Sequence, residues 1–382
     1  MTPVAMAIHG LVNGHSQPSQ PPRSIRPGVF APIPTFFTAG TQDLDLETFK
    51  IQVVKVAIAG VGIVIAGTMG EAHHLSPSER IALIKAARSA LDDASPSLAH
   101  VPIIAGTGSG STKQTIELTH DAYQAGADYA IVIMSGFFAG ALASNRNALK
   151  RYWSDVAENS PLPLFIYNYP GAAGGIDLES DLIVELAEEN PNIIGIKLTC
   201  GNVGKLTRIA AETADPVWMK AHPRSIPSPF LVLGGFVDFL LPSVFANAHG
   251  AITGLANVAP HAIRTLSDLS FACHPSSPVP TKGEQPDLSR KSIFAEAQRL
   301  QGIIANADRT IALAGVAGTK WLLRRQDPGL FPPGSECPRR PLMKLDDEAG
   351  ERLWMQRDVV ALKVEESNAA ASAGASCSTT VA

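Results

Sequence analysis

The sequence predicts an α/β fold, a closed barrel of eight parallel strands that alternate with helices. Eight short apolar runs follow one another between about residues 28 and 272, as strands covered on both faces should, and helical patterns separate them. The runs are Val29–Thr35, Gly62–Ala66, Val101–Ala105, Tyr129–Met134, Leu164–Tyr167, Ile193–Lys197, Phe230–Leu233 and Ala251–Gly254. Eight such alternations in roughly 250 residues favour a (β/α)8 TIM barrel over a doubly wound sheet.

The segments between the runs carry signals for helix starts and ends. Ser76-Pro77-Ser78-Glu79 has the pattern of a capping box with proline at the first helical position. Ser111 precedes the next helical run, and Gly126 is placed to cap its C-terminus. Beyond the barrel, the proline-rich residues 274–289 predict a surface loop, and helical patterns resume near Lys291.

The chain has 382 residues, of which 45% are hydrophobic and 17% charged, enough for one large core with extensions. We predict a disordered leader over residues 1–27 and a catalytic barrel over 28–272. A Pro/Ser-rich loop with a C-terminal helical extension follows over 273–365. Residues 366–382 are rich in alanine and serine without an aromatic residue, which predicts a disordered tail.

Charge and cysteine content narrow the function class. The formal net charge is −4, with acids and bases interspersed, so the sequence has no electrostatic footprint for nucleic acid or an anionic membrane. The longest apolar region is interrupted by glycines and does not reach a membrane span. The four cysteines lack zinc or disulfide spacing, which indicates a reducing, cytoplasmic location. The leader contains no acid and two arginines, which leaves a weak mitochondrial presequence as the alternative.

Lys197 is the most informative residue, because it ends the apolar run Asn192–Lys197. An amine at the mouth of a buried strand loses hydration, which favours its neutral form and lets it attack a ketone carbonyl. An isolated lysine would more commonly extend its amine into water. This lysine is not isolated, since Leu164–Asn168 is another apolar run with a polar end and the Gly67–Glu71 turn follows a third.

The ends of the second, fifth and sixth strands therefore predict a site. Catalytic residues of such barrels come from the C-terminal ends of the strands, which meet at one face. Thr68, Tyr167 and Lys197 stand where these three strands end. Together they suggest imine chemistry at this face.

Other polar residues near the strand ends have structural interpretations. His73 and His74 are adjacent on a loop, point in different directions and lack a companion carboxylate spacing, so we expect no metal site. Cys200 is expected to be a buried small hydrophobe. Residues 106–108 form a lone glycine pattern without the companions of a nucleotide site.

Six motifs occupy the strand ends and the loops that follow them. They are Gly67-Thr68-Met69-Gly70-Glu71, Ala105-Gly106-Thr107-Gly108-Ser109, Tyr167-Asn168-Tyr169-Pro170, Gly195-Ile196-Lys197, Gly250-Ala251-Ile252-Thr253 and Asn257-Val258-Ala259-Pro260. This set resembles the signature of the dihydrodipicolinate synthase and N-acetylneuraminate lyase family, over roughly residues 28–360. The sequences of residues 166–174 and 197–202 look like those of the fungal members, which include 2-keto-3-deoxy sugar-acid aldolases and 4-hydroxy-2-oxoglutarate aldolase.

The resemblance implies a class I aldolase that needs no cofactor or metal. Lys197 would form an imine with the ketone carbon of pyruvate or a larger 2-oxo acid, and Tyr167 would donate and accept the proton of the aldol step. Thr68 would belong to the proton relay. Glu71 would be a structural carboxylate that accepts from backbone donors beside the turn, in preference to a general base. The Thr68 hydroxyl and the N–H groups of Thr68 and Met69 would receive the substrate carboxylate, with the Ile252 carbonyl as a further contact. Relatives are commonly homotetramers, so a homo-oligomer is expected.

Three departures from the family pattern bear on the substrate. Met69 stands where many relatives have a second hydroxyl residue in the turn. Phe137 and Phe138 stand where the synthases usually place two tyrosines, which removes a hydroxyl from the proton relay. Ala172 stands where the lysine-pathway synthase carries an arginine for its second substrate, so authentic dihydrodipicolinate synthesis is not expected.

The expected function is cleavage or formation of a carbon–carbon bond in a 4-hydroxy-2-oxo acid, such as a 2-keto-3-deoxy hexulosonate or 4-hydroxy-2-oxoglutarate. Two alternatives remain open. One is dihydrodipicolinate synthase-like or hydratase-aldolase activity on a less polar aldehyde partner, which the apolar replacements favour. The other is a noncatalytic 2-oxo-acid binding protein that keeps the fold.

Overall fold

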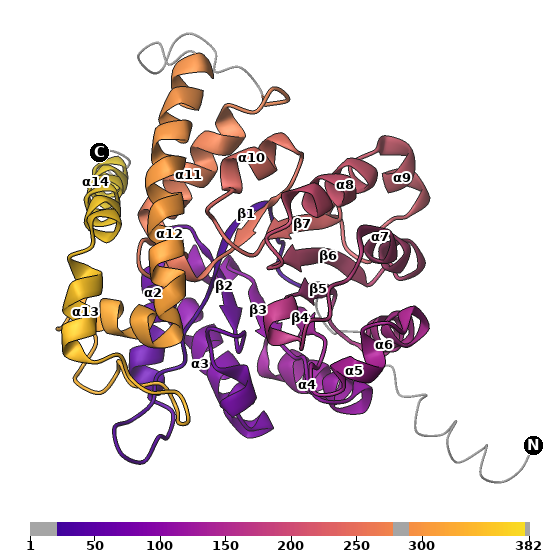
Figure 1. The fold of residues 1–382 in the computed structure, drawn as a ribbon, viewed down its shortest axis with the longest axis horizontal. Coiled ribbons are helices and arrows are strands. Elements are labelled where there is room, and N and C mark those ends of the chain that lie inside the picture. The colour runs from indigo at the N-terminus through magenta and orange to yellow at the C-terminus, as the bar shows by residue number, and fades with distance from the viewer. Residues whose placement is uncertain (1–20, 278–289, 379–382) are drawn as a thin grey trace, which may run out of the picture.

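The computed structural model describes residues 21–277 and 290–378, and in it the chain closes into a barrel of eight parallel strands (Figure 1). The strands are β1 (Gly28–Pro32), β2 (Gly62–Ile65), β3 (Ile103–Gly106), β4 (Tyr129–Ile133), β5 (Leu164–Asn168), β6 (Ile193–Leu198), β7 (Leu231–Gly234) and β8 (Gly250–Ile252). The predicted fold class is confirmed. The largest shift of a strand start is at β3, predicted from Val101, because Pro102 has no N–H to donate to the sheet.

Side chains fill the inside of the barrel. The interior cluster includes Phe30, Val64, Ile104, Ile131, Phe165, Ile194, Leu231 and Ile252, all nearly inaccessible to solvent. A larger cluster packs the outer face of the strands against the surrounding helices. Strands covered on both faces explain why each run is continuously apolar.

The pairing of β5 with β6 aligns the predicted chemistry. Tyr167 pairs with Lys197, and the register shifts between Leu164 and Phe165 because β6 carries one extra residue there. As a result Ile194 belongs to the interior cluster, and Lys197, three residues later, also lies against a side chain of that cluster. A bulge of this kind re-aims a side chain, which simple alternation along the strand would not predict.

Helices surround the barrel between the strands. They are α2 (Leu46–Ile58), α3 (Pro77–Ala94), α4 (Thr112–Ala125), α5 (Ala139–Leu142), α6 (Arg146–Asn159), α7 (Ser180–Glu189), α8 (Val203–Thr213), α9 (Pro216–Ala221), α10 (Leu240–Phe245) and α11 (Pro260–Ala272). Short 3-10 helices follow β2 (η1, Ala72–His74), α3 (η2, Leu98–His100), β5 (η3, Pro170–Ala172) and β8 (η4, Gly254–Asn257). The capping box at Ser76 and Glu79 is confirmed, as are the caps at Ser111 and Gly126.

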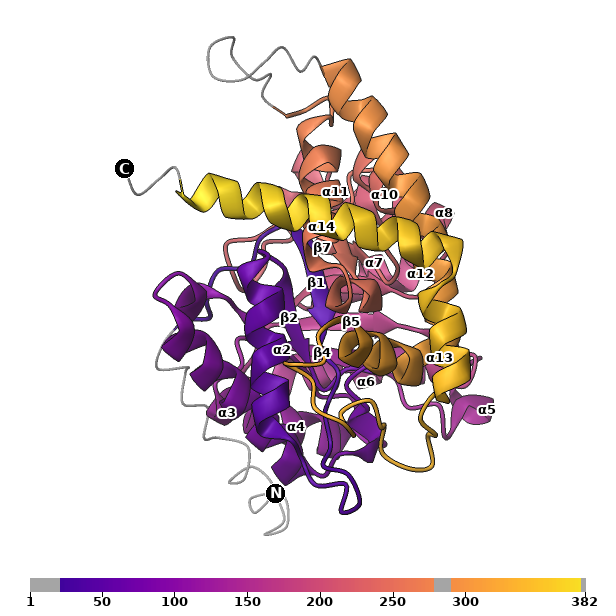
Figure 2. The same ribbon diagram turned by 90° about the vertical axis from the view of Figure 1, so that its left-hand side faces the viewer.

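The C-terminal extension consists of α12 (Arg290–Gln326), α13 (Asp347–Trp354) and α14 (Arg357–Ser378). In Figure 2, α14 crosses the side of the molecule, where it packs against α11 and α12. Gly315 breaks α12 into two straight parts, since its φ of 61° and ψ of −151° are not helical. That backbone region is essentially restricted to glycine, so Gly315 sets the direction of the second part of the helix.

Both ends of the chain differ from the predicted disorder where the structure describes them. Ile25 is buried in the interior cluster, and Arg23 forms an ion pair with Asp128, so part of the predicted leader closes the N-terminal end of the barrel. Residues 366–378 continue α14, because alanine has a high helix propensity and Glu366 accepts hydrogen bonds at the start of α11. Residues 1–20, most of the predicted loop (278–289) and 379–382 lie outside the described residues. Within the described parts, no helix is both long and apolar enough to cross a membrane.

Candidate active site

Lys197 lies near the C-terminal end of β6 and is buried, with 6% of its surface exposed. Its Nζ lies 4.1 Å from the centre of the Tyr167 ring on the neighbouring strand. The prediction that these two residues face the same space is therefore supported by their positions. The amine did not extend into water because its strand is covered by side chains on both faces.

Lys197 differs from the other buried lysines of the described residues in having no carboxylate partner. The Lys205 Nζ lies 2.6 Å from Asp177 Oδ1, and the Lys320 Nζ lies 2.6 Å from Glu71 Oε1. No ion pair of Lys197 is found in the described part of the chain. Imine formation needs an amine that no carboxylate engages, and among the buried lysines of the described residues Lys197 is the one without such a partner.

Thr68 lies in the turn that follows β2, and it reaches the same space. Its Oγ1 lies 3.2 Å from the Tyr167 hydroxyl. The turn is bounded by two residues in the left-handed region, Ala66 with φ 52° and Glu71 with φ 55°. The N–H groups of Thr68 and Met69 have no acceptor among the described residues, so they are free to bind an anion.

Met69 and Ile252 stand at the edge of this space. The Met69 methyl lies against Gly254, where an added Cβ would approach it to 3.0 Å. The Ile252 side chain is fully buried inside the barrel, at the end of β8. Five predicted site residues are therefore carried by strand ends on one face of the barrel: Thr68, Met69, Tyr167, Lys197 and Ile252.

The sequence did not single out Thr199, although it lies two residues beyond Lys197. Thr199 is 8% exposed, and its hydroxyl is buried without a hydrogen-bond partner among the described residues. It lies directly against Gly235 in the loop after β7, where an added Cβ would be 2.1 Å from its Oγ1. A buried unpaired hydroxyl is costly, which makes this one a candidate for a hydrogen bond with a ligand. Its position two residues beyond Lys197, just past the end of β6, is the sequence signal that could have found it.

Tyr169 stacks on Tyr167, with ring centres 5.9 Å apart. Burial, and next the neighbouring Tyr167, raises the pKa of Tyr169, so its hydroxyl keeps its proton at neutral pH. It therefore adds a hydrogen-bond donor to the wall of the site.

The carboxylate of Glu71 makes structural contacts, as expected, but its partners include side chains as well as a backbone N–H. It accepts from the Arg339 N–H at 2.9 Å, and it binds the Lys320 ammonium and His74 Nδ1. Burial, and next the charge of Arg80, lowers the pKa of His73. No group of three or more side chains suited to a metal is found in the described residues.

Of the three departures from the family pattern, Met69 lies in the turn after β2, and the other two lie in loops after β4 and β5. Phe137 and Phe138 are exposed, at 88% and 59%, and pack edge to face on each other. Ala172 ends η3. A cavity of about 600 Å³ lies at the opposite, N-terminal end of the strands, lined by Arg26, His100 and Arg264 among others, and it contains none of the predicted site residues.

Comparisons with known proteins identify the family of the chain. A family model described as the Dihydrodipicolinate synthetase family matches residues 27–277. The chain is 36% identical to the L-threo-3-deoxy-hexylosonate aldolase of Aspergillus niger over 354 residues, which is 90% of this chain and 97% of that protein. It is 37% identical over 332 residues to a protein of Emericella nidulans named "Probable 4-hydroxy-2-oxoglutarate aldolase, mitochondrial", covering 87% of this chain and 94% of that one.

A solved structure is similar over nearly its whole length. It is that of YagE, a prophage protein of the dihydrodipicolinic acid synthase family from E. coli K12, in complex with pyruvate. It superimposes with a TM-score of 0.70 at 26% sequence identity, covering 90% of this chain and 99% of that one.

Proposed function

Because this chain belongs to the dihydrodipicolinate synthetase family, we propose that it is a class I aldolase that uses Lys197 as its nucleophile. Its substrate is a 4-hydroxy-2-oxo acid, such as a 2-keto-3-deoxy hexulosonate or 4-hydroxy-2-oxoglutarate. The names of the two fungal relatives support this substrate class. The observation that carries the proposal is the buried Lys197 amine, without a counter-ion, beside the Thr68–Tyr167 hydroxyl pair.

Binding begins at the turn after β2. The substrate carboxylate accepts from the free N–H groups of Thr68 and Met69 and from the Thr68 hydroxyl. This contact places the neighbouring ketone carbon toward Lys197. The Ile252 carbonyl is a further polar contact at this end of the substrate.

Cleavage then proceeds through the imine. The Lys197 amine adds to the ketone carbon C2, and the Tyr167 hydroxyl supplies the proton with which the hydroxyl of the adduct leaves as water, so that a protonated imine remains. Removal of the proton of the C4 hydroxyl breaks the C3–C4 bond, releases an aldehyde and moves the electron pair into the imine as an enamine. Tyr167 accepts and returns the proton, with Thr68 as its hydrogen-bonded relay partner. Protonation of the enamine at C3 and hydrolysis release pyruvate and restore Lys197.

The part of the substrate beyond C4 would meet Thr199 and Tyr169. The Thr199 hydroxyl has no protein partner among the described residues, so a substrate hydroxyl can satisfy it. Two polar groups in this wall suit a hydroxylated aldehyde product better than an apolar one, which supports the sugar-acid class over the hydratase-aldolase alternative.

Borohydride reduction in the presence of pyruvate tests the mechanism. We expect the mass of the reduced pyruvate adduct on the peptide that contains Lys197, and no adduct in the Lys197→Arg variant, because a guanidinium cannot form the imine. An adduct on another lysine, or none, contradicts the assignment. The absence of any adduct would favour the noncatalytic binding protein.

A panel of 2-oxo acids, assayed by pyruvate release, tests the substrate class. Cleavage of 2-keto-3-deoxy hexulosonates or 4-hydroxy-2-oxoglutarate is expected. Faster turnover with substrates that yield an apolar aldehyde would support the hydratase-aldolase alternative instead.

We also infer a homo-oligomer in a reducing compartment, cytoplasmic or mitochondrial. Cys200, Cys273 and Cys337 are free thiols, which suits a reducing compartment. The name of one relative includes the mitochondrion. Size-exclusion chromatography with light scattering tests the oligomer, and fractionation of cells tests the location.

A further inference from the structure

The turn after β2 has a conformation that its own residues do not favour. Ala66 and Glu71 both have positive φ without being glycine, and such residues persist in this region only when their surroundings hold them there. The Ala66 carbonyl rests on Gly106, where an added Cβ would approach its oxygen to 1.9 Å. On the other side, the Thr35 hydroxyl donates to the Gly70 carbonyl at 2.7 Å.

The strongest hold on the turn comes from the C-terminal extension. Lys320, in the second part of α12, donates to Glu71 Oε1 at 2.6 Å, and both side chains are completely buried. The ammonium group also donates to the Cys337 carbonyl at 3.2 Å and lies 4.7 Å from the centre of the Phe37 ring. The Arg339 N–H donates to the second oxygen of the same carboxylate.

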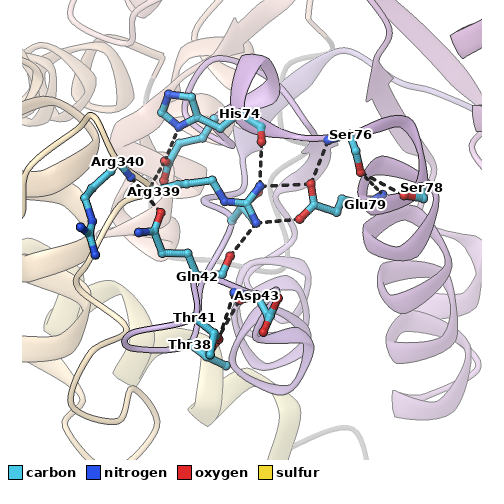
Figure 3. Close-up of polar contacts among 12 residues, drawn as sticks. Thr38, Thr41, Gln42, Asp43, His74, Ser76, Ser78, Glu79, Arg339 and Arg340 are labelled. Carbon is cyan, nitrogen blue, oxygen red and sulfur yellow. Dashed lines mark hydrogen bonds and ion pairs between the residues drawn. The ribbon is translucent and has the colours of Figure 1, made fainter.

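The side chain of Arg339 ties the same loop to the barrel a second time (Figure 3). Its guanidinium donates to both carboxylate oxygens of Glu79, at 2.6 and 3.1 Å. It also donates to the His74 carbonyl at 2.7 Å and to the Gln42 carbonyl at 2.6 Å. Glu79 is the capping-box residue of α3, so Arg339 fixes the segment between the turn and that helix.

A fully buried ion pair is a poor means of adding stability. The loss of hydration by both charges offsets most of their attraction, and an apolar pair of the same volume commonly stabilises a core as well. What the pair provides is a fixed geometry, because a buried carboxylate must stay where its donors are. Here the donors Lys320 and Arg339 are separated from Glu71 by 249 and 268 residues.

We propose that Lys320 and Arg339 are positioning residues, which hold Glu71 so that the turn presents Thr68 and Met69 to the substrate carboxylate and the Thr68 hydroxyl to Tyr167. The C-terminal extension is then part of the catalytic apparatus and not only a cover for the side of the barrel. This inference rests on the proposed function.

The test replaces the pair without leaving a buried charge. The Lys320→Met/Glu71→Gln double variant removes the ion pair, while the amide oxygen of the introduced glutamine can still accept from the Arg339 N–H. We expect KM for the 2-oxo acid to rise about tenfold or more and kcat to fall by a similar factor, since each lost hydrogen bond of this kind is equivalent to roughly one factor of ten. The pyruvate concentration that gives half-maximal borohydride trapping on Lys197 should rise in parallel. Kinetics are measured at a temperature where circular dichroism shows a folded protein.

Arg339→Lys provides a second, milder variant that keeps the backbone N–H on Glu71. It retains a positive charge but cannot bridge both Glu79 oxygens and two carbonyls, so KM should rise by a smaller factor. Glu366→Gln is the matched control, because it weakens the contact of α14 with α11 without touching the turn. It should lower the unfolding temperature and leave KM and kcat unchanged.

Values of KM and kcat within twofold of the unmodified enzyme in the folded double variant would overturn the inference. An equal loss in Glu366→Gln would overturn it too, because general loosening would then explain the effect. If pyruvate is not trapped on Lys197 even in the unmodified protein, the proposed function itself fails, and the two failures are thereby distinguished.

Discussion

At the scale of single residues, two buried polar groups at the candidate site lack a protein partner among the described residues. Lys197 has no counter-ion and Thr199 has no hydrogen-bond partner among the described residues, whereas Lys205, Lys320 and Asn168 are each fully engaged. The engaged groups stabilise loops, and the unengaged ones are the groups that a substrate would complete. Among the three buried lysines of the described residues, the missing counter-ion therefore singles out Lys197 as the candidate nucleophile.

The hydroxyl of Tyr167 should matter for turnover more than for binding. Tyr167→Phe is expected to lower kcat by about a hundredfold or more, with a much smaller change in KM, because the phenol transfers a proton in the reaction. Steady-state cleavage of a 2-keto-3-deoxy acid measures both constants. Tyr152→Phe, which removes a buried hydroxyl from a contact with Thr115 elsewhere, should leave kcat unchanged. A near-normal kcat in Tyr167→Phe would move the proton transfer to Thr68 or to water.

The hydroxyl of Thr199 should act on the aldehyde half of the substrate. Thr199→Val keeps the shape of the side chain and removes the hydrogen bond, so kcat/KM for a hydroxylated substrate should fall about tenfold. Half-saturation of pyruvate trapping on Lys197 should be unchanged, because pyruvate does not reach that far. If pyruvate trapping weakens by the same factor, Thr199 acts on the imine and not on the aldehyde.

At the scale of elements, α12 touches two loops at the catalytic end of the barrel. Its second part holds the turn after β2 through Lys320, and its first part holds the loop after β7 through Asp308 and Gln301. Asp308 accepts from the Val237 N–H at 3.0 Å. Burial raises the pKa of Asp308 to about 7.

This raised pKa predicts a pH dependence of stability. Unfolding lets Asp308 lose its proton at its ordinary pKa near 4, whereas the folded protein keeps it up to about pH 7, so stability falls as pH rises between these values. Asp308→Asn keeps an acceptor for Val237 and cannot ionise. The free energy of unfolding of this variant, relative to the unmodified protein, should therefore increase by roughly 1–3 kcal/mol from pH 4 to pH 8.

Urea unfolding at several pH values measures this difference. His249, whose pKa burial lowers to about 4, gives the opposite dependence, but it is present in both proteins and cancels. Parallel curves for the two proteins would show that Asp308 is already ionised in the fold.

The elements themselves were predictable to a large extent. Continuous apolar runs and capping signals determined the strands and several helices, because both depend on residues that are neighbours in sequence. The β-bulge that turns Ile194 and Lys197 toward the barrel interior depends on pairing between strands. The contact of Lys320 with Glu71 depends on packing between residues that are 249 positions apart in the sequence. Neither has a local signal. The order of residues 21–27 was also missed, because one buried side chain, Ile25, and one ion pair suffice to fix it.

At the scale of the whole molecule, the predicted site residues lie at one end of the barrel, and we expect the loops after β4 and β5 to select the second substrate. Aspartate semialdehyde should be a poor second substrate, because Ala172 provides no guanidinium for its carboxylate. The measurement compares kcat/KM for condensation of pyruvate with the semialdehyde against kcat/KM for cleavage of 2-keto-3-deoxy acids. Clearly faster condensation would show that the protein is a synthase and that Ala172, Phe137 and Phe138 do not have the meaning given to them.

The contact between Glu71 and Lys320 also sets the order in which a newly made chain can become active. Synthesis from the N-terminus delivers all eight strands and Lys197 before Lys320 or Arg339 exists. Until those last residues have been synthesised, the carboxylate of Glu71 lacks both the Lys320 ammonium and the Arg339 N–H. We therefore expect the turn that carries Thr68 and Met69 to take its final conformation only after the C-terminal extension has been made.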